Sequence, residues 1–366
     1  MTKIKNIIQT LTEWAPPAYQ ASYDNAQLLT GDKDTDVSSV LVTLDCTEEI
    51  VDEAIQKNAN LIVAHHPIIF GGLKSLTGKT YIERTIIKAI KNDIAIYAIH
   101  TNLDSVSTGV NKMICDKLGL NQVKILDLQA NTLKKLTTYC PESHTKTLIK
   151  SLNNAGAGNI GNYENCAFQS SGTGQFKPNK NAQPFVGKIN KLEYVTENKI
   201  EVLYPSHLEG SILKVLKKNH PYEEVAYYAT PLSNLNQEVG SGMVGELDEV
   251  MNESNFLKML KKEFNLEVIQ HTQLLGKQIK RVAVCGGAGS FLLQKAIGTG
   301  ADIFITADFK YHEFFDAEKK LIIADIGHYE SEVFTKDLIC KYISKKFTNI
   351  AVDLSEISTN PIYYYT

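Results

Sequence analysis

Histidine and carboxylate side chains recur where apolar, strand-like segments of this sequence end. The residues in these places are His65, His66, His100, Asp104, Asp308, His312, His328 and Glu332. In the second half of the chain the spacing is regular, because His312 follows Asp308 by four positions and Glu332 follows His328 by four. Imidazole nitrogens together with carboxylate oxygens suit zinc, iron or manganese. The pattern therefore indicates a metal site.

The local spacing of these residues allows more than one ion. His65 and His66 would point to opposite faces of a continuing strand, but Pro67 breaks the strand and lets the two rings diverge toward neighbouring ions. His328 and Glu332 would share one face of a helix. A carboxylate can bridge two ions, and a pair of ions can activate a shared water as a nucleophile.

Each residue also has a structural interpretation that involves no metal. A histidine at a strand end is commonly hydrogen-bonded or exposed, and Asp104 could cap the following turn. Glu332 could simply favour the first turn of a helix, where negative charge is stabilised by about 0.3–1 kcal/mol. His312 could lie on a solvated helix face. The joint occurrence of these residues at successive strand ends favours the metal site.

The elements that must position these residues follow from hydrophobic periodicity. Strands are predicted at 38–45, 60–67, 94–104, 281–290, 301–308 and 321–328, and helices at 48–59, 81–93, 109–120, 290–298, 311–320 and 330–347. The alternation of strand and helix predicts an α/β fold of mostly parallel sheets with helices on both faces. In open α/β sheets, ligand sites form outside the carboxyl ends of the strands, which is where the histidines lie.

In the middle of the chain, the order of predicted strands and helices differs from that on either side. Two similar β–α–β patterns flank a Gly- and Asn-rich stretch between about 133 and 232, which predicts a ferredoxin-like α+β insert. We therefore expect residues 1–130 and 235–366 to form together the metal-binding α/β core, as two similar halves. Residues 131–234 would form the insert domain.

Composition narrows the classes of function. The chain has 366 residues, of which 43% are apolar and 22% charged, as in ordinary globular proteins. A net charge of -3 argues against a nucleic-acid partner, since no basic excess is available. The N-terminal segment is amphipathic rather than a secretory signal, and no apolar stretch is long enough to span a membrane. Six scattered cysteines without a CxxC pair predict buried, reduced thiols, so we expect a cytoplasmic protein.

The glycine-rich segment from Gly286 to Ser290 has two interpretations. Its backbone N–H groups could face a phosphate, or it could form a tight strand-to-helix turn. The complete dinucleotide-binding spacing is absent. No GxSxG elbow or P-loop is present either, so nucleophilic-serine and Walker-type chemistry have no support.

Several segments carry a resemblance to a known family. They are YDNAQLLTGD (23–32), AHHPIIF (64–70), HTNLDSVSTGVN (100–111), VCGGAGSF (284–291), ADIFITADFKYHE (301–313) and IGHYESE (326–332). In this order the sequence resembles the NIF-three-like dinuclear metal centre proteins, often labelled GTP cyclohydrolase I type 2 homologues. Residues 156–178 and 219–232 look like the insert of the longer bacterial members, akin to CutA and the nitrogen-regulatory PII proteins.

The resemblance implies a specific site. Two divalent ions, zinc, iron or manganese, would be bound by His65, His66, Asp104, His328 and Glu332, with Asp104 as the bridge. His100 and His312 would stand close by, either as residues that hold the ligands in place or as catalytic proton-transfer groups. Two departures, Gln27 in place of the usual glycine and the sequence TAD at 306–308, touch none of the five ligands.

The resemblance also implies an assembly and an activity. Members of this family form toroidal homohexamers whose metal sites face an inner cavity. The expected function is that of a metal-dependent hydrolase acting on a small molecule such as a nucleotide, with GTP cyclohydrolase activity as the named candidate. The alternative is a non-catalytic regulatory or metal-handling protein whose insert domain senses a ligand.

Overall fold

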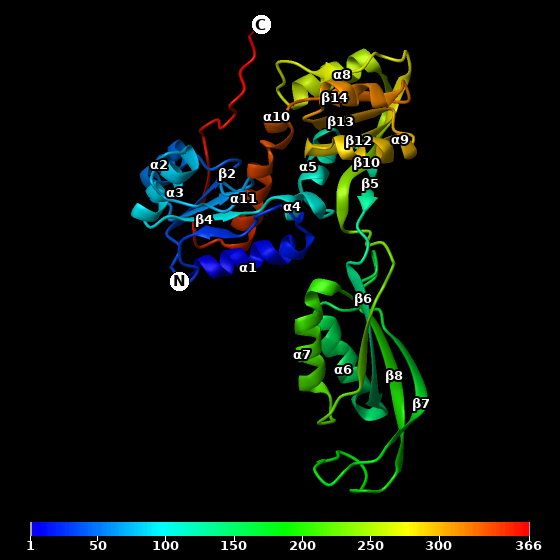
Figure 1. The fold of residues 1–366 in the computed structure, drawn as a ribbon. Helices are drawn as coiled ribbons and strands as arrows, with labels where there is room; N and C mark the ends of the chain where they lie inside the picture. Colours follow the sequence, from blue (N-terminus) through cyan, green and yellow to red (C-terminus); the bar gives the residue numbers. More distant parts are fainter. Residues whose placement is uncertain (1, 366) are drawn as a thin grey trace. The chain divides into compact units, whose positions relative to one another are not determined.

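The computed structural model describes residues 2–365, which form two compact units (Figure 1). The first unit comprises the chain up to Asp127 and from Val239 onward, and the second comprises Leu128–Glu238. The predicted boundaries, 1–130, 131–234 and 235–366, lie close to these limits. That the second unit is an independent inserted domain stays a prediction.

The first unit contains a five-stranded sheet with the strand order β1-β4-β3-β2-β15. Its strands are β1 (Leu28–Thr30), β2 (Ser39–Thr43), β3 (Leu61–Ala64), β4 (Ala95–Ala98) and β15 (Ala351–Leu354). Strands β4, β3, β2 and β15 pair in parallel, and β1 adds an antiparallel edge. The parallel pairing fits the near-continuous burial of β2, β3 and β4, which have helices on both faces.

Alternate residues of these strands pack into two cores. Leu41, Ile62 and Ile96 face the helices α2 (Glu48–Gln56) and α3 (Tyr81–Lys91). Val40, Val42, Leu61, Val63 and Tyr97 belong to the other core, with residues of α1 (Ile4–Trp14) and α11 (Thr335–Lys346). The strand period of two thus places helices on both faces of the sheet.

The first unit also contains a six-stranded sheet with the strand order β11-β14-β13-β12-β10-β5. Its strands are β5 (Asn121–Leu128), β10 (Gly240–Asn252), β11 (Gln270–His271), β12 (Gln278–Ala288), β13 (Ile303–Ala307) and β14 (Ile322–Asp325). Strands β12, β13 and β14 pair in parallel, whereas β10 and β11 pair antiparallel with their neighbours β12 and β14. One face packs on α9 (Leu293–Gly298), and the other on α5 (Val110–Lys117) and α8 (Glu253–Glu263).

The prediction of an α/β fold is therefore confirmed as a mixed α/β fold. The predicted mostly parallel sheets are not confirmed, because both sheets of the first unit combine parallel with antiparallel pairs. The largest local difference concerns the predicted strand at 94–104. Strand β4 ends at Ala98, and α4 (Thr101–Ser105) begins two residues after Ile99. Asp24 accepts hydrogen bonds from the backbone N–H and hydroxyl of Thr101, which stabilises the start of this helix. Asp104 consequently lies on a helix and not on a strand.

The C-terminal helices also differ from the prediction. Residues Tyr311–Ala317 form the 3-10 helix η4 instead of an α-helix. The predicted helix at 330–347 is two helices, α10 (His328–Glu332) and α11. The remaining short 3-10 helices are η1 (Pro17–Tyr19), η2 (Ser206–Leu208) and η3 (Ser290–Leu292).

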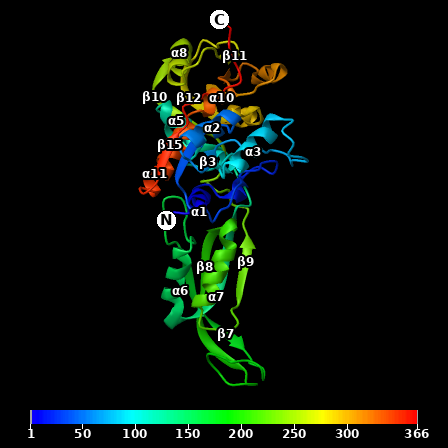
Figure 2. The ribbon, with the colours of Figure 1, turned by 90° about the vertical axis from the view of Figure 1, so that its left-hand side faces the viewer.

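The second unit has one four-stranded sheet covered on one face by two helices (Figure 2). Along the chain its elements are β6 (Leu133–Pro141), α6 (Glu142–Asn154), β7 (Phe168–Phe176), β8 (Glu193–Pro205), α7 (Glu209–Asn219) and β9 (Tyr227–Pro231). The strand order is β7-β8-β6-β9, with antiparallel pairing throughout. Leu136, Ile200 and Val202 pack against Leu148 of α6 and Leu216 of α7.

We predict that Leu128–Glu238 can be deleted without unfolding the first unit. A Cβ atom added to Gly240 would lie only 2.1 Å from the carbonyl oxygen of Asp127, so the two chain ends that a deletion leaves are adjacent. Joining them through a short glycine linker should give a soluble protein with a cooperative thermal transition and helical circular dichroism. An insoluble or non-cooperative product would contradict the inserted-domain organisation.

Candidate metal centre

Apart from His312, the histidines and carboxylates of the predicted site converge at the carboxyl ends of strands from both sheets of the first unit. His65 and His66 directly follow β3, and His100 lies two residues after β4. His328 begins α10 shortly after β14, and Glu332 ends the same helix. This is the edge of an α/β sheet at which ligands bind.

Two groups of side chains share the carboxylate of Glu332. In one group, Glu332 Oε2 lies 2.9 Å from His66 Nε2 and 3.1 Å from His328 Nε2. In the other, His65 Nε2 lies 4.0 Å from Glu332 Oε1 and 3.6 Å from Asp104 Oδ1. Each group brings its ligand atoms within 4.8 Å of one another, which is close enough for one metal ion. His100 joins His65 and His66 in a third such group.

Two polar atoms of this cluster are buried without a hydrogen-bond partner among the described residues. They are Nε2 of His65 and Oδ1 of Asp104. An unpaired buried polar atom costs about 1–3 kcal/mol, so native structures rarely retain one without a reason. A divalent cation between an imidazole nitrogen and two carboxylates would satisfy both atoms. The residues present therefore fit a metal site.

The second nitrogen of each ring has a partner that orients the ring. Four contacts of 2.7–2.8 Å do this: His65 Nδ1 with the carbonyl of Ile99, His66 Nδ1 with Asp45, His100 Nδ1 with Asp24, and His328 Nδ1 with Asp308. When Nδ1 donates in these bonds, the Nε2 lone pair of each ring is left for a cation or a proton. Carboxylate–histidine pairs of this kind are typical of metal sites.

Asp24 and Asp45 hold histidines of the candidate site through hydrogen bonds, and sequence reasoning did not assign either of them to the site. Asp45 follows β2 closely, so the same strand-end argument could have found it. Asp24 lies in a loop far from His100 in the sequence, and only its place in the segment YDN offered a signal. Asp308 was noted as a strand-end carboxylate, and its backbone adopts the left-handed conformation (φ 58°), which aspartate tolerates better than most residues.

Burial and charge set the protonation of the cluster. Burial lowers the pKa of His65 to about 3, so this ring is neutral. Burial also acts against protonation of His66, but hydrogen bonds to Asp45 and Glu332 outweigh it and raise the pKa to about 10. Hydrogen bonds to Glu332 and Asp308 likewise overcome burial and raise the pKa of His328 to about 9. Since ligands must be deprotonated, metal binding here would displace protons from His66 and His328.

The two carboxylates differ in their environments. Burial raises the pKa of Asp104 well above its usual value, and the neighbouring charge of Glu332 raises it further. Burial acts in the same direction on Glu332, but hydrogen bonds from His328 and His66 outweigh it and hold its pKa well below the usual value.

The glycine-rich segment packs against Glu332. A Cβ atom on Gly287 would lie 2.4 Å from Glu332 Oε1, and the residue has φ 62°, so glycine is required here. The backbone N–H of Gly286 donates to Asn111, and that of Gly287 donates to Ser331. Both groups already have acceptors, which favours the structural interpretation of this segment over a phosphate-binding one.

His312 is the one predicted site residue that the structure does not bring to the cluster. It is exposed on η4, where its ring contacts Tyr311 and Phe315. It is absent from the described residues that line the cleft around the cluster. A role for His312 in proton transfer stays a prediction.

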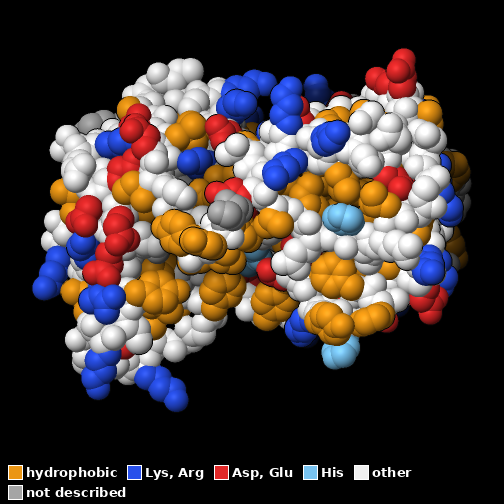
Figure 3. Space-filling model, turned by 90° about the horizontal axis from the view of Figure 1, so that it is seen from above, with side chains coloured by type: hydrophobic (Ala, Val, Ile, Leu, Met, Phe, Trp, Pro, Cys, Tyr) orange, Lys and Arg blue, Asp and Glu red, His pale blue; other side chains and the backbone are white. Residues whose placement is uncertain are grey.

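The cluster opens into a cleft of about 700 Å³. Tyr23, Phe70, Tyr81, Tyr329 and Ile362 are among its lining residues. From above, hydrophobic side chains border a hollow in which histidine and carboxylate atoms are partly visible (Figure 3). The volume is in the range of pockets that enclose small organic molecules.

Fold and site together define a mixed α/β protein with a candidate His–carboxylate metal centre at the ends of two sheets. The family model described as Duf34/NIF3 (NGG1p interacting factor 3) matches residues 2–361. The chain belongs to the Duf34/NIF3 family, which confirms the resemblance seen in the sequence.

Relatives of this chain share its full length. A protein of Halalkalibacterium halodurans named GTP cyclohydrolase 1 type 2 homolog is 39% identical, with 98% of each chain covered. A Bacillus subtilis protein of the same name is 37% identical, again over 98% of each chain. The crystal structure of a Bacillus cereus protein related to NIF3 has a TM-score of 0.89 at 36% identity, covering 100% of this chain and 99% of that one.

Among the described residues, no helix is both long and apolar enough to cross a bilayer.

Replacing Asp104 with asparagine should stabilise the metal-free protein at neutral pH. Because the pKa of Asp104 is raised in the folded protein, ionisation of this carboxyl group disfavours folding. The free energy of unfolding is therefore highest below pH 3.8, the usual pKa of the carboxyl group, and it falls as the pH rises through the raised pKa. An asparagine side chain cannot ionise, so we expect a gain on the order of 1 kcal/mol at neutral pH that shrinks toward acidic pH.

Thermal melts of chelator-treated protein across pH would measure this difference. Asp316→Asn, which changes an exposed carboxylate on η4, is the matched control and should not shift the transition. A destabilised Asp104→Asn protein at neutral pH would show that the ionised carboxylate stabilises the metal-free fold, and it would contradict the raised pKa of Asp104.

Proposed function

We propose that this protein binds two divalent metal ions in the cleft of the first unit and acts there as a hydrolase on a small molecule. The observation that carries the proposal is the pair of buried, unpartnered atoms, His65 Nε2 and Asp104 Oδ1, beside the carboxylate of Glu332. The proposal is supported by sequence similarity, over nearly the whole chain, to relatives named GTP cyclohydrolase 1 type 2 homolog.

The five proposed ligands divide between two ions. His66 and His328 would hold one ion, His65 and Asp104 the other, and Glu332 would contribute one carboxylate oxygen to each. The distances thus favour Glu332 as the shared carboxylate, whereas the family resemblance suggested Asp104 as the bridge. Three imidazoles and two carboxylates form a borderline donor set that suits zinc, iron or manganese.

The residues around the ligands would prepare the site for hydrolysis. Two divalent ions, when bound, supply Lewis acidity that activates water for attack. His100 donates its Nδ1 proton to Asp24 Oδ1 at 2.8 Å, so its Nε2 can accept a proton inside the cleft. The ring of Phe70 packs edge-on against that of His100, with ring centroids 5.6 Å apart. We propose His100 as the general base or acid of the reaction.

The aromatic lining of the cleft supports a flat, ring-containing substrate. Tyr23, Phe70 and Tyr81 are each more than half exposed and line the same cavity, so their rings are accessible to a ligand. Aromatic side chains stack on nucleobases whatever the base. We therefore propose a nucleotide as the substrate class, with hydrolytic opening of the guanine ring of GTP as the first candidate.

The second candidate function is regulatory or metal-handling without catalysis. One observation favours it, namely a separate cavity of about 670 Å³ in the second unit, which could receive a signalling ligand. On this hypothesis the bound metal would be cargo or a structural element, and His100 would be dispensable.

We further propose that the chain assembles as a homohexamer and works in the cytoplasm. Exposed large apolar side chains on both units, among them Phe168, Tyr194 and Phe291, support contact with other copies. Six free cysteines support a reducing compartment. The β–α–β–β–α–β order of the second unit supports its assignment as a ferredoxin-like insert.

A substrate screen with the metal-loaded protein separates the two candidate functions. We expect GTP or another nucleotide to be hydrolysed, and His100→Gln to reduce kcat by about 10²–10⁴-fold while metal content stays unchanged. His144→Gln, which alters a partly exposed histidine of the second unit, should leave the rate unchanged. No turnover of nucleotides, phosphoesters or amides by fully metal-loaded protein would reject the hydrolase in favour of the regulatory alternative.

A further inference from the structure

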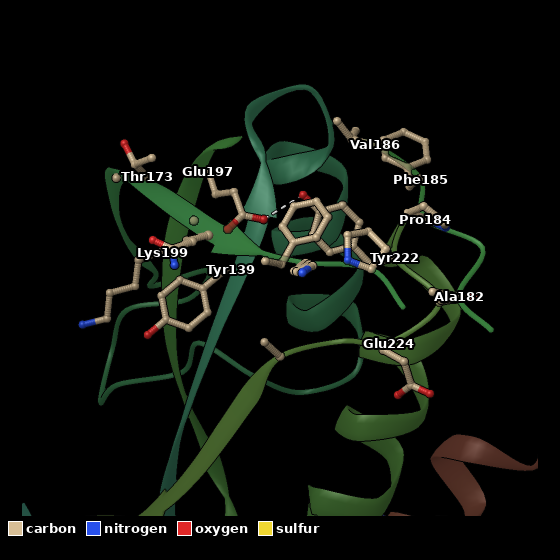
Figure 4. A pocket seen from close by; sticks show the side chains of 18 of the residues that line it. Tyr139, Thr173, Ala182, Pro184, Phe185, Val186, Glu197, Lys199, Tyr222 and Glu224 are labelled. Atoms are coloured by element: carbon tan, nitrogen blue, oxygen red, sulfur yellow. Dashed lines mark hydrogen bonds between the residues drawn. The ribbon is translucent and has the colours of Figure 1, made fainter. Parts of the chain in front are cut away.

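The second unit contains a cavity of about 670 Å³ that the proposed hydrolytic site does not use (Figure 4). Its floor is formed by side chains of β6, β7 and β8, and its walls by the segments 176–186 and 222–226. The volume suits a ligand the size of a small metabolite.

The floor belongs to the sheet face opposite the two helices. Along β8, Ile200 and Val202 pack in the core with α6 and α7. Glu197 and Lys199 alternate with these positions and therefore point to the other face. Tyr139 of β6 is the direct partner of Lys199 in the sheet, so it lies on the same face.

Glu197 is the central charged group of this cavity. It is only 9% exposed, and its Oε1 accepts a hydrogen bond of 2.7 Å from the hydroxyl of Tyr222, as Figure 4 shows. Among the described residues, Oε2 has no hydrogen-bond or ion-pair partner. A Cβ atom on Gly174 would lie 2.1 Å from Oε2, so the glycine on the neighbouring strand leaves the room that this oxygen occupies.

No cation of the chain neutralises Glu197 among the described residues. Lys199 also lines the cavity, but its ammonium pairs with Glu201 at 3.1 Å. Glu223 and Glu224 add two further carboxylates to the lining and Lys177 one further ammonium, so three carboxylates face two ammonium groups. A buried carboxylate is costly unless a positive group or several donors satisfy it, so this cavity favours a positively charged ligand over an anion.

Aromatic side chains complete the site. The rings of Phe185 and Tyr222 lie 6.1 Å apart, and Tyr139 and Phe176 line the cavity as well. Phe185 also packs edge-on against His144 of α6, which fixes the wall segment to the helix. Aromatic faces attract organic cations and pack against their apolar parts.

We propose that this cavity binds a small organic amine, with its ammonium group on Glu197 Oε2 and its apolar body against Tyr139, Phe185 and Tyr222. A charge-assisted hydrogen bond to the carboxylate would provide orientation, and the aromatic walls would provide most of the buried surface. The site is separate from the metal centre and does not depend on the proposed hydrolysis.

Isothermal titration calorimetry of the full-length protein with tyramine tests the proposal. Tyramine carries an ammonium group and an aromatic body, and tyrosol is its neutral alcohol counterpart. We expect saturable binding of tyramine, and an affinity for tyrosol at least about tenfold weaker because the charge-assisted bond is lost. Equal affinity for the two compounds, or no saturable binding of tyramine at millimolar concentration, would overturn the proposal.

Two variants locate the binding. Glu197→Gln keeps an acceptor for Tyr222 but removes the charge, and it should weaken tyramine binding by about tenfold or more. Glu142→Gln, an exposed position at the start of α6, should leave the affinity unchanged. Circular dichroism checks that both variants are folded, and the comparison of tyramine with tyrosol on the unaltered protein decides the matter if Glu197→Gln does not fold. Unchanged affinity in folded Glu197→Gln would place the amine elsewhere and reject this site.

Discussion

The structure of the candidate centre depends on one buried carboxylate, Glu332. Its two oxygens face separate groups of histidines, and these histidines come from the two different sheets of the first unit. A buried carboxylate is stable only with cationic or hydrogen-bonding partners, so the ends of β3 and β14 must bring His66 and His328 to it. The first unit therefore has a polar centre whose charge must be balanced by protons or by metal ions.

The surrounding chain is adapted to this constraint. Gly287 leaves space for one oxygen of Glu332, and the Ser331 hydroxyl accepts a hydrogen bond from the backbone N–H of Gly287, so the C-terminal end of β12 and the helix α10 hold each other in place. Asp45 and Asp308 orient the rings of His66 and His328 through Nδ1. Strand ends, the glycine-rich segment and the carboxylates of Asp45 and Asp308 thus together position the side chains of Glu332, His66 and His328. Such outer contacts that orient the ligands are expected of a site that binds cations.

The sequence predicted the elements that bury a regular apolar pattern and the histidines at their ends. Strands β2, β3 and β13 and helices α2 and α3 were foreseen, because their periodicities are strong. It did not predict β10 and β15, which pair with segments remote in the sequence, or the switch from strand to helix before Asp104. That switch depends on Asp24, and the pairing of Asp45 with His66 is equally non-local, so local patterns could not reveal either.

Metal stoichiometry tests the shared role of Glu332 most directly. Protein purified without chelators and loaded with zinc, iron or manganese should contain about two equivalents per chain by elemental analysis. His328→Ala removes a ligand from one proposed ion only and should leave about one equivalent, whereas Glu332→Gln removes charge from both and should leave almost none. If Glu332→Gln retained both ions, or if the unaltered protein took up no metal, the two-ion account of this cleft would be contradicted.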